Sequence, residues 1–422
     1  MKEQKIIYII GLIIYLLFAI GSECLYRNKL YDESVKYEED IDQDGFWHHF
    51  FYFWAMIFLY SSMGIGIIIT LFFYPINITF SYFSIPMLLT FTMCMLKSIY
   101  SNPRPYWDIY EGKQGVRKDK FQPEPTECDG GFGNPSGHAL ISTYLLCLWD
   151  LFINSTRFNK FQGTKKTFIK YFSLSLSIIF MFFIMYSRIQ RQIHSINQVL
   201  FGAILGMAIF FIFCHILEIS KITTSIFIDI LDKFKIILIP IALVLFTISV
   251  IIGLNRHNDK EKKYLKILHI YCDYEKNEVF GKNTAFHSTI IFLVIGGYIG
   301  LLFLRYQIRK NHPGKEEIFY NWNKVKRRIT AVNIATFCFA LPILLGSIVV
   351  LIPFKYYALK FIASILFYFT YGFLSMGVLV YYGCIIFKKE DLQNDENDLL
   401  IEDEEDKEDE EDKGDKEEIK DE

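Results

Sequence analysis

Three short polar segments of the chain combine cations and histidines in a pattern that suits phosphoryl transfer. Their sequences are KSIYSNPRPYW, CDGGFGNPSGHA and SRIQRQIHSINQ, and each adjoins a long apolar run. Ionisable residues beside apolar spans are costly to bury and are therefore functional candidates. The residues that carry this chemistry are Lys97, Arg104, Ser136, Gly137, His138, Arg188, His194 and Gln198.

The three cations of this set, Lys97, Arg104 and Arg188, would surround a phosphate group. An arginine binds phosphate through a planar, two-pronged guanidinium. Positive charge beside the equatorial oxygens stabilises the transition state of phosphoryl transfer. Gly137 lets the backbone approach the anion, and the N–H groups around Ser136 would begin a helix that points at it. We therefore predict a phosphate-binding site.

The two histidines suit the two chemical steps of a phosphatase. One would attack phosphorus and form a covalent phosphohistidine. The other would protonate the leaving oxygen and then activate water for the second step. Because the cations supply the positive charge and the sequence offers no carboxylate cluster for a two-metal site, we expect neither a metal nor a cofactor.

These residues resemble the signature of the type-2 phosphatidic acid phosphatase and vanadium haloperoxidase superfamily, which reads KxxxxxxRP, then PSGH, then SRxxxxxHxxxD. The first two motifs fit in full, and the third fits except that Gln198 stands in place of the aspartate. The resemblance implies that His194 is the nucleophile and His138 the general acid. It also implies that Gln198 orients the nucleophile through its carbonyl, without the charge that an aspartate would add.

The glutamine and its surroundings are similar to one branch of that superfamily. HxxxQ resembles both the glucose-6-phosphatase and the dolichyl diphosphate phosphatase branches. RPYW, a long loop, CxxGxGxPSGHA and then HxxxQVxxGxxxG favour the first of the two. That resemblance covers roughly residues 45–390. It implies a multi-pass protein of the endoplasmic reticulum membrane that hydrolyses glucose 6-phosphate at a lumenal site.

The composition indicates a membrane-embedded body with an acidic tail. Hydrophobic residues make up 52% of the chain, whose net charge is −2. Residues 395–422 carry 18 acidic and 4 basic residues, so the rest of the chain carries +12. Basic residues that lie between apolar segments set membrane orientation, and we expect no nucleic-acid partner. A soluble globular enzyme and a membrane β-barrel are excluded because the apolar runs have the length of transmembrane helices.

We predict an all-α polytopic membrane bundle of nine or ten transmembrane helices. Residues 1–22 fit a signal peptide and a signal anchor equally well. Residues 45–220 form the phosphatase core, residues 235–388 add further transmembrane helices, and residues 389–422 form a disordered cytosolic tail. The expected spans are 50–73, 79–97, 136–153, 171–187, 196–218, 235–254, 285–304, 331–353 and 359–387, with 6–22 as a tenth if it is retained.

The distribution of basic residues predicts which face holds the site. The basic loops 154–171 and 305–329 should be cytosolic, which places all three motifs on the opposite, lumenal face. Loop 255–284, with seven basic and five acidic residues, argues weakly against this orientation. An oxidising lumen would permit a disulfide between Cys128 and Cys272.

The substrate stays open between two classes of phosphate ester. A sugar phosphate needs a polar lumenal vestibule, which the charged loop 106–134 slightly favours. A lipid phosphatase acting on phosphatidate, sphingoid phosphate or dolichyl diphosphate would use the same residues and need a lateral opening between spans. A non-enzymatic binder or transporter that retains the motif as a relic is the third reading. Gln198 speaks for that reading, and the intact cations and histidines speak against it.

Overall fold

A computed structural model of the full chain shows a bundle of helices. All the secondary-structure elements of its described residues are helices, which confirms the predicted all-α class. The described residues are 2–39, 45–47, 49–55, 57, 76–112, 131–153, 164–213, 224–255, 264–266, 268–269, 280–314, 349, 352, 356–378 and 380–381.

Eleven helical elements position the site and the bundle within these residues. Six long helical stretches among them are long and apolar enough to cross a membrane, and two shorter helices, α5 and α7, are also apolar. The elements are α1 (Lys2–Glu39), α3 (Ile76–Tyr100), α4 (Pro105–Gly112), α5 (Gly137–Ile153), α6 (Thr164–Gln190), α7 (Ile196–Phe211), α8 (Thr224–Asn255), α10 (Phe280–Ser288), α11 (Ile291–Asn311), α14 (Tyr357–Phe373) and the π-helix η6 (Leu374–Val378).

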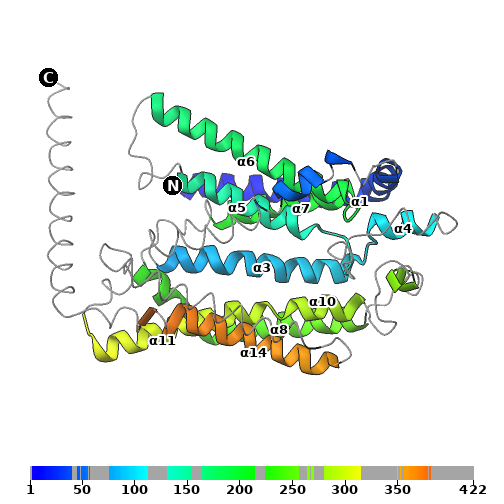
Figure 1. Cartoon of the computed structure of the whole chain (residues 1–422). Helices are drawn as coiled ribbons and strands as arrows, with labels where there is room; N and C mark the ends of the chain where they lie inside the picture. Colours follow the sequence, from blue (N-terminus) through cyan, green and yellow to red (C-terminus); the bar gives the residue numbers. More distant parts are fainter. Residues whose placement is uncertain are drawn as a thin grey trace, which may run out of the picture.

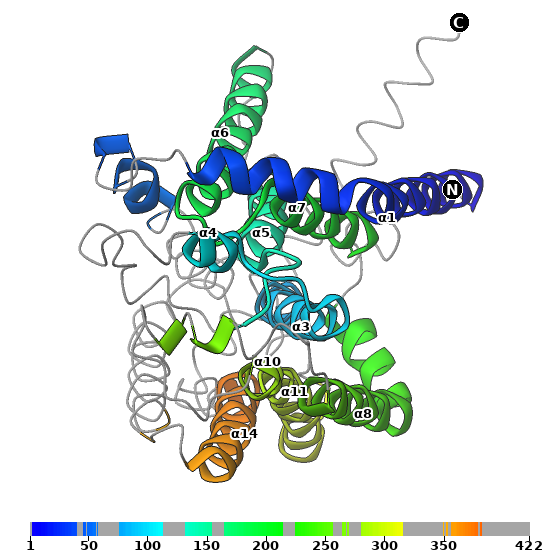
Figure 2. The same cartoon turned by 90° about the vertical axis from the view of Figure 1, so that its right-hand side faces the viewer.

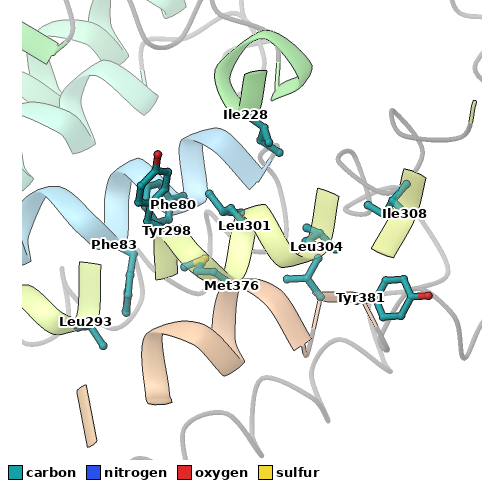
Figure 3. Packing of buried hydrophobic residues seen from close by; sticks show 11 residues of the cluster. Phe80, Phe83, Ile228, Leu293, Tyr298, Leu301, Leu304, Ile308, Met376 and Tyr381 are labelled. Carbon is teal, nitrogen blue, oxygen red and sulfur yellow. The ribbon is translucent and has the colours of Figure 1, made fainter. Parts of the chain in front are cut away.

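Helix α3 lies between two groups of helices (Figures 1 and 2). Helices α1, α5, α6 and α7 lie on one side of it, where α5 contacts α3. Helices α8, α10, α11 and α14 lie on the other side, where α8, α10 and α11 contact α3. Apolar side chains from α3, α8, α11 and η6 meet in one buried cluster that includes Phe80, Leu301 and Met376 (Figure 3). The central position of α3 fixes the place of the first motif, because Lys97 lies in its last turn.

The contact between α5 and α7 depends on two small residues of α7. A Cβ on Gly202 would come within 2.5 Å of the Ser136 carbonyl oxygen, and a Cβ on Gly206 would clash with the Leu140 carbonyl. Small residues let membrane helices approach closely, where packing rather than water exclusion holds them together. Because α5 begins at Gly137 and α7 begins directly after His194 and Ser195, this contact sets the separation of two motifs.

The first helix extends far beyond the predicted apolar run 6–22. Helix α1 is continuous to Glu39, and residue 22 lies in its middle. Residues 23–39 contain no Gly or Pro, so nothing in their backbone chemistry ends the helix. Residues 23–39 therefore continue the helix that begins with the apolar run.

Several predicted features lie outside the described residues. These are both cysteines of the suggested disulfide, Cys128 and Cys272, together with most of the spans 50–73 and 331–353, most of the loop after α4, and the acidic tail. The predicted spans 6–22, 79–97, 136–153, 171–187 and 235–254 lie within described helices except for residue 136, and 285–304 falls on α10 and α11. The predicted spans 196–218 and 359–387 begin in α7 and α14 and end outside the described residues.

The same Gly→Ala substitution at two helical positions should separate the effect of helix packing on stability from the effect of helix propensity. We expect Gly206→Ala to destabilise the folded protein by about 1–3 kcal/mol, since its Cβ meets rigid backbone of α5. Gly11→Ala is the control, because a Cβ there meets nothing within 4 Å. Thermal unfolding in detergent, with phosphatase activity measured alongside, tests this. Equal melting temperatures for the two variants would contradict the close α5–α7 packing.

Candidate active site

The three polar segments meet at the end of the bundle where α3 ends and α5 and α7 begin (Figure 1). Backbone hydrogen bonds join them directly. The Gly133 N–H donates to the Asn102 carbonyl over 2.9 Å, which links the first two segments. The Ser136 N–H donates to the carbonyl of Gln198 over 3.0 Å, which links the second and third. The residues singled out in the sequence thus come from one continuous hydrogen-bonded assembly.

The three cations are buried within this assembly. Arg104 is fully buried, and Lys97 and Arg188 are nearly so. Arg104 donates from Nε to the Gly131 carbonyl over 2.6 Å and from Nη1 to the Ile193 carbonyl over 3.4 Å. One guanidinium therefore fastens the first segment to both of the others. Burying three cations together is costly without compensating charge, so the arrangement suits an anionic ligand.

A tight turn after α6 brings Arg188 and His194 together. The N–H groups of Ile193 and His194 both donate to the Arg188 carbonyl, over 3.2 and 3.3 Å. Gln192 within this turn has a φ of 56°, in the left-handed region that non-glycine residues rarely adopt. Its carbonyl accepts the Tyr106 N–H over 3.0 Å, which holds the strained turn against α4. Such strain is commonly stored at functional sites.

The imidazole of His194 is at the electrostatic centre of the site. Its side chain is almost fully buried, and this burial lowers the pKa of His194 well below its usual value. The positive charges of Arg104, Lys97 and Arg188 lower that pKa further, as does His138. The lowered pKa favours the neutral imidazole at neutral pH, and the neutral imidazole is the form that can act as a nucleophile.

Hydrogen bonds at Gln198 fix which nitrogen of His194 is protonated. The amide Nε2 of Gln198 donates to the Pro103 carbonyl over 2.8 Å, so its Oε1 must be the atom that faces His194. Oε1 lies 3.3 Å from Nδ1 of His194 and also accepts the Ser195 N–H over 3.4 Å. An acceptor at this position requires Nδ1 to carry the proton. Nε2 of His194 therefore keeps its lone pair.

The second segment supplies small and hydroxyl groups close to the histidines. Ser136 is fully buried, and among the described residues its Oγ has no hydrogen-bond partner. A bound phosphate oxygen would meet this otherwise unsatisfied hydroxyl. His138 lies half-buried in the first turn of α5, where the helix N-terminus favours anions. Gly137 contacts α3, because a Cβ there would clash with the Met93 side chain, which is a packing reason for this glycine.

Helix α1 contributes to the site in a way that the sequence reasoning missed. Its Glu23 carboxylate is buried and accepts hydrogen bonds from Asn134 and Asn197. Its Ser34 accepts the N–H of Ile196, the first residue of α7. The available signal was helical spacing, since Glu23 and Ser34 are eleven residues apart and so lie on one face of a continuous helix.

A polar cleft adjoins the site between α1 and α4. It has a volume of about 790 Å³. Tyr31 of α1 donates to Oδ2 of Asp108 over 2.7 Å, and Tyr264 donates to Oδ1 of the same carboxylate over 3.0 Å. Asn102 and Pro103 line the cleft, and their carbonyl groups accept the hydrogen bonds from Gly133 and Gln198. Its lining residues are Arg27, Asn28, Tyr31, Asp32, Val35, Lys36, Asn102, Pro103 and Asp108.

Comparison with known families gives one match. Residues 78–222 match the PAP2 superfamily, the type-2 phosphatidic acid phosphatases. This region contains all three polar segments and supports a phosphatase of that kind acting on phosphorylated substrates in a membrane. No match was found among curated proteins or among solved structures. The likeness to the glucose-6-phosphatase branch therefore depends on the motif residues alone.

The orientation of the Gln198 amide can be tested by an isosteric change. Gln198→Glu replaces the Nε2 donor by an oxygen that faces the Pro103 carbonyl. We expect kcat to fall by about tenfold or more, since losing a buried hydrogen bond costs about 1–3 kcal/mol. Gln307→Glu is the matched control, because among the described residues the Gln307 side chain serves as an acceptor, for Asn311. Full activity in Gln198→Glu would show that the amide donor is dispensable.

The effect of the cations on the pKa of His194 should appear in the pH profile of kcat/KM. Removing the charge of Lys97 by Lys97→Met raises the pKa of His194, so more of the imidazole is protonated in acid. The acid limb should move to higher pH, and kcat/KM should fall by about a hundredfold or more. Substrate ionisation is common to both enzymes and cancels. The exposed Lys170 offers the control, Lys170→Met. An unshifted acid limb would show that Lys97 does not act on His194.

Proposed function

We propose that this chain hydrolyses a phosphomonoester through a phosphohistidine on His194, with a sugar monophosphate, glucose 6-phosphate first, as its substrate. The observation that carries the reaction is the state of the His194 side chain. Burial and the charges of Arg104, Lys97 and Arg188 lower its pKa, which favours the neutral form, and the carbonyl oxygen of Gln198 lies 3.3 Å from its Nδ1.

In the first step Nε2 of His194 attacks phosphorus with its lone pair. The new P–N bond forms as the P–O bond to the leaving group breaks. His138 donates its proton to that leaving oxygen, so the product departs as a neutral alcohol. Lys97, Arg104 and Arg188 stabilise the charge on the equatorial oxygens. Ser136 and the start of α5 bind the phosphate through hydrogen bonds.

In the second step water replaces the histidine. The neutral His138 takes a proton from a water molecule, whose oxygen attacks phosphorus. The P–N bond breaks, its electron pair returns to Nε2 of His194, and phosphate leaves. Both histidines are then back in their starting protonation states, and the hydrogen bond from Nδ1 to Gln198 is kept throughout.

The polar cleft beside the site supports a sugar rather than an acyl chain as the leaving group. Its wall carries charged and amide groups from α1, with Asp108 held in place by two tyrosines. Hydroxyl groups of a sugar can bond to such side chains, whereas burying acyl chains against them would leave polar groups unpaired.

We also propose that the site faces the lumen of the endoplasmic reticulum. The start of α6, with Lys165, Lys166 and Lys170, lies at the opposite end of the bundle from α4 (Figure 1). Basic residues mark the cytosolic end of membrane helices. That rule puts the histidines and the cleft on the other face.

Phosphate release from purified membranes tests both parts of the proposal. The panel holds glucose 6-phosphate, phosphatidate and dolichyl diphosphate, with His194→Ala beside the wild type. We expect release from the sugar phosphate, stimulated by permeabilising the membrane, and a loss of about a thousandfold or more in His194→Ala. Release from a lipid alone would keep the mechanism and overturn the sugar assignment. Unchanged activity in His194→Ala would overturn the phosphohistidine.

A further inference from the structure

A buried carboxylate from helix α1 joins two of the polar segments. Glu23 is only 5% exposed. Its Oε1 accepts a hydrogen bond from Nδ2 of Asn134 over 2.6 Å and another from Nδ2 of Asn197 over 3.3 Å. Both amides are themselves buried, so neither can exchange this partner for bulk water without a rearrangement.

The two asparagines stand beside the proposed catalytic groups. Asn134 comes two residues before Ser136, in the segment that leads to His138. Asn197 comes directly before Gln198, and its Oδ1 accepts the hydroxyl of Ser195 over 2.6 Å. A single oxygen of α1 thus links the segment that holds the proposed acid to the helix start that holds the nucleophile.

Two further contacts place α1 against the turn that carries His194. Ser34 Oγ accepts the backbone N–H of Ile196 over 2.9 Å, which satisfies a free donor at the start of α7. The Gln192 side chain donates to the backbone carbonyl of Glu38. Positions 23, 34 and 38 fall on one face of a helix. This face meets the site along more than three turns.

We propose that Glu23 is a positioning residue of this active site, which fixes the separation of the His138 and His194 segments. The inference rests on the proposed function, because it concerns the same reaction. Glu23 acts through Asn134 and Asn197 and does not contact the phosphate. An error of about 1 Å in the placement of reacting groups can cost about a hundredfold in rate. Loss of the hydrogen bonds of Glu23 should therefore lower kcat while the three cations stay in place.

The role of Glu23 requires an intact α1. Residues before it bind the same partner helix, since Tyr15 donates to the Ile204 carbonyl over 3.3 Å and Tyr8 packs edge-on against Phe211. Cleavage after residue 22 would leave Glu23 at a chain end without these contacts. We therefore expect an amino-terminal epitope tag to stay on the active enzyme, and its absence from active enzyme would overturn the proposal.

The decisive experiment compares Glu23→Ala with Glu23→Gln in the full-length protein. The alanine removes the acceptor of both hydrogen bonds, whereas the glutamine keeps a carbonyl oxygen at the same position. We expect kcat per folded protein to fall by about 10- to 100-fold in Glu23→Ala, with KM changed by less than about threefold. Glu23→Gln should recover kcat to within about fivefold of the wild type.

A matched control removes another hydrogen bond between α1 and α7. Tyr15→Phe deletes the bond to Ile204, which is remote from the histidines, and it should leave kcat unchanged. Equal loss of kcat in Glu23→Gln and Glu23→Ala would overturn the hydrogen-bonded positioning role. So would a Glu23→Ala enzyme with less folded protein and a wild-type kcat.

The failure of this inference can be told apart from the failure of the proposed function. His194→Ala is measured in the same assay. If His194→Ala abolishes turnover while Glu23→Ala retains it, the reaction stands and the role of Glu23 is wrong. If His194→Ala keeps its activity, the phosphohistidine mechanism is wrong, and with it the proposal for Glu23.

Discussion

The site depends on one side-chain amide that is fixed at both ends. Gln198 donates to the Pro103 carbonyl and presents its own oxygen to Nδ1 of His194. The first contact determines the second, because an amide whose nitrogen faces the Pro103 carbonyl turns its oxygen toward His194. The tautomer of the imidazole, and with it the nitrogen left free for chemistry, follows from a hydrogen bond to the backbone of a different motif. A carboxylate has no N–H to donate to the Pro103 carbonyl, which explains why a glutamine suits this position.

The scaffold around this amide is built by close helix contacts rather than by a water-driven core. Lipid removes most of the hydrophobic difference between packed and unpacked apolar faces, so small residues and interhelical hydrogen bonds carry more of the specificity. Gly202 and Gly206 bring α7 onto α5, and the Ser136 N–H then reaches the Gln198 carbonyl. The contact between α5 and α7 therefore aligns the second and third motifs. The buried Arg104 joins the first motif to both of them through its hydrogen bonds to the Gly131 and Ile193 carbonyls.

The sequence was sufficient for the motif residues and insufficient for what supports them. Cations, histidines and glycines at fixed spacing identify chemistry that needs those residue types, and the apolar runs identify helices by length. Glu23 could not be recognised in this way. It lies beyond the apolar run 6–22 and belongs to none of the three motifs, and its partners Asn134 and Asn197 lie more than a hundred residues away. Glu23 meets these partners because α1 continues past its apolar part and packs against α7, and the second of these is a property of tertiary structure.

The electrostatics of the site make the basicity of His194, the proposed nucleophile, depend on a bound anion. Without an anion, burial and the cations keep His194 neutral and also make it a weak base. A phosphate ester brings a charge of about −1.5 to −2 at neutral pH, which offsets the field of Lys97, Arg104 and Arg188. In the proposed reaction, binding therefore restores the basicity of Nε2 at the moment when the lone pair must attack. Gln198 suits this order of events, because a neutral orienting group leaves the charge balance of the site to the substrate.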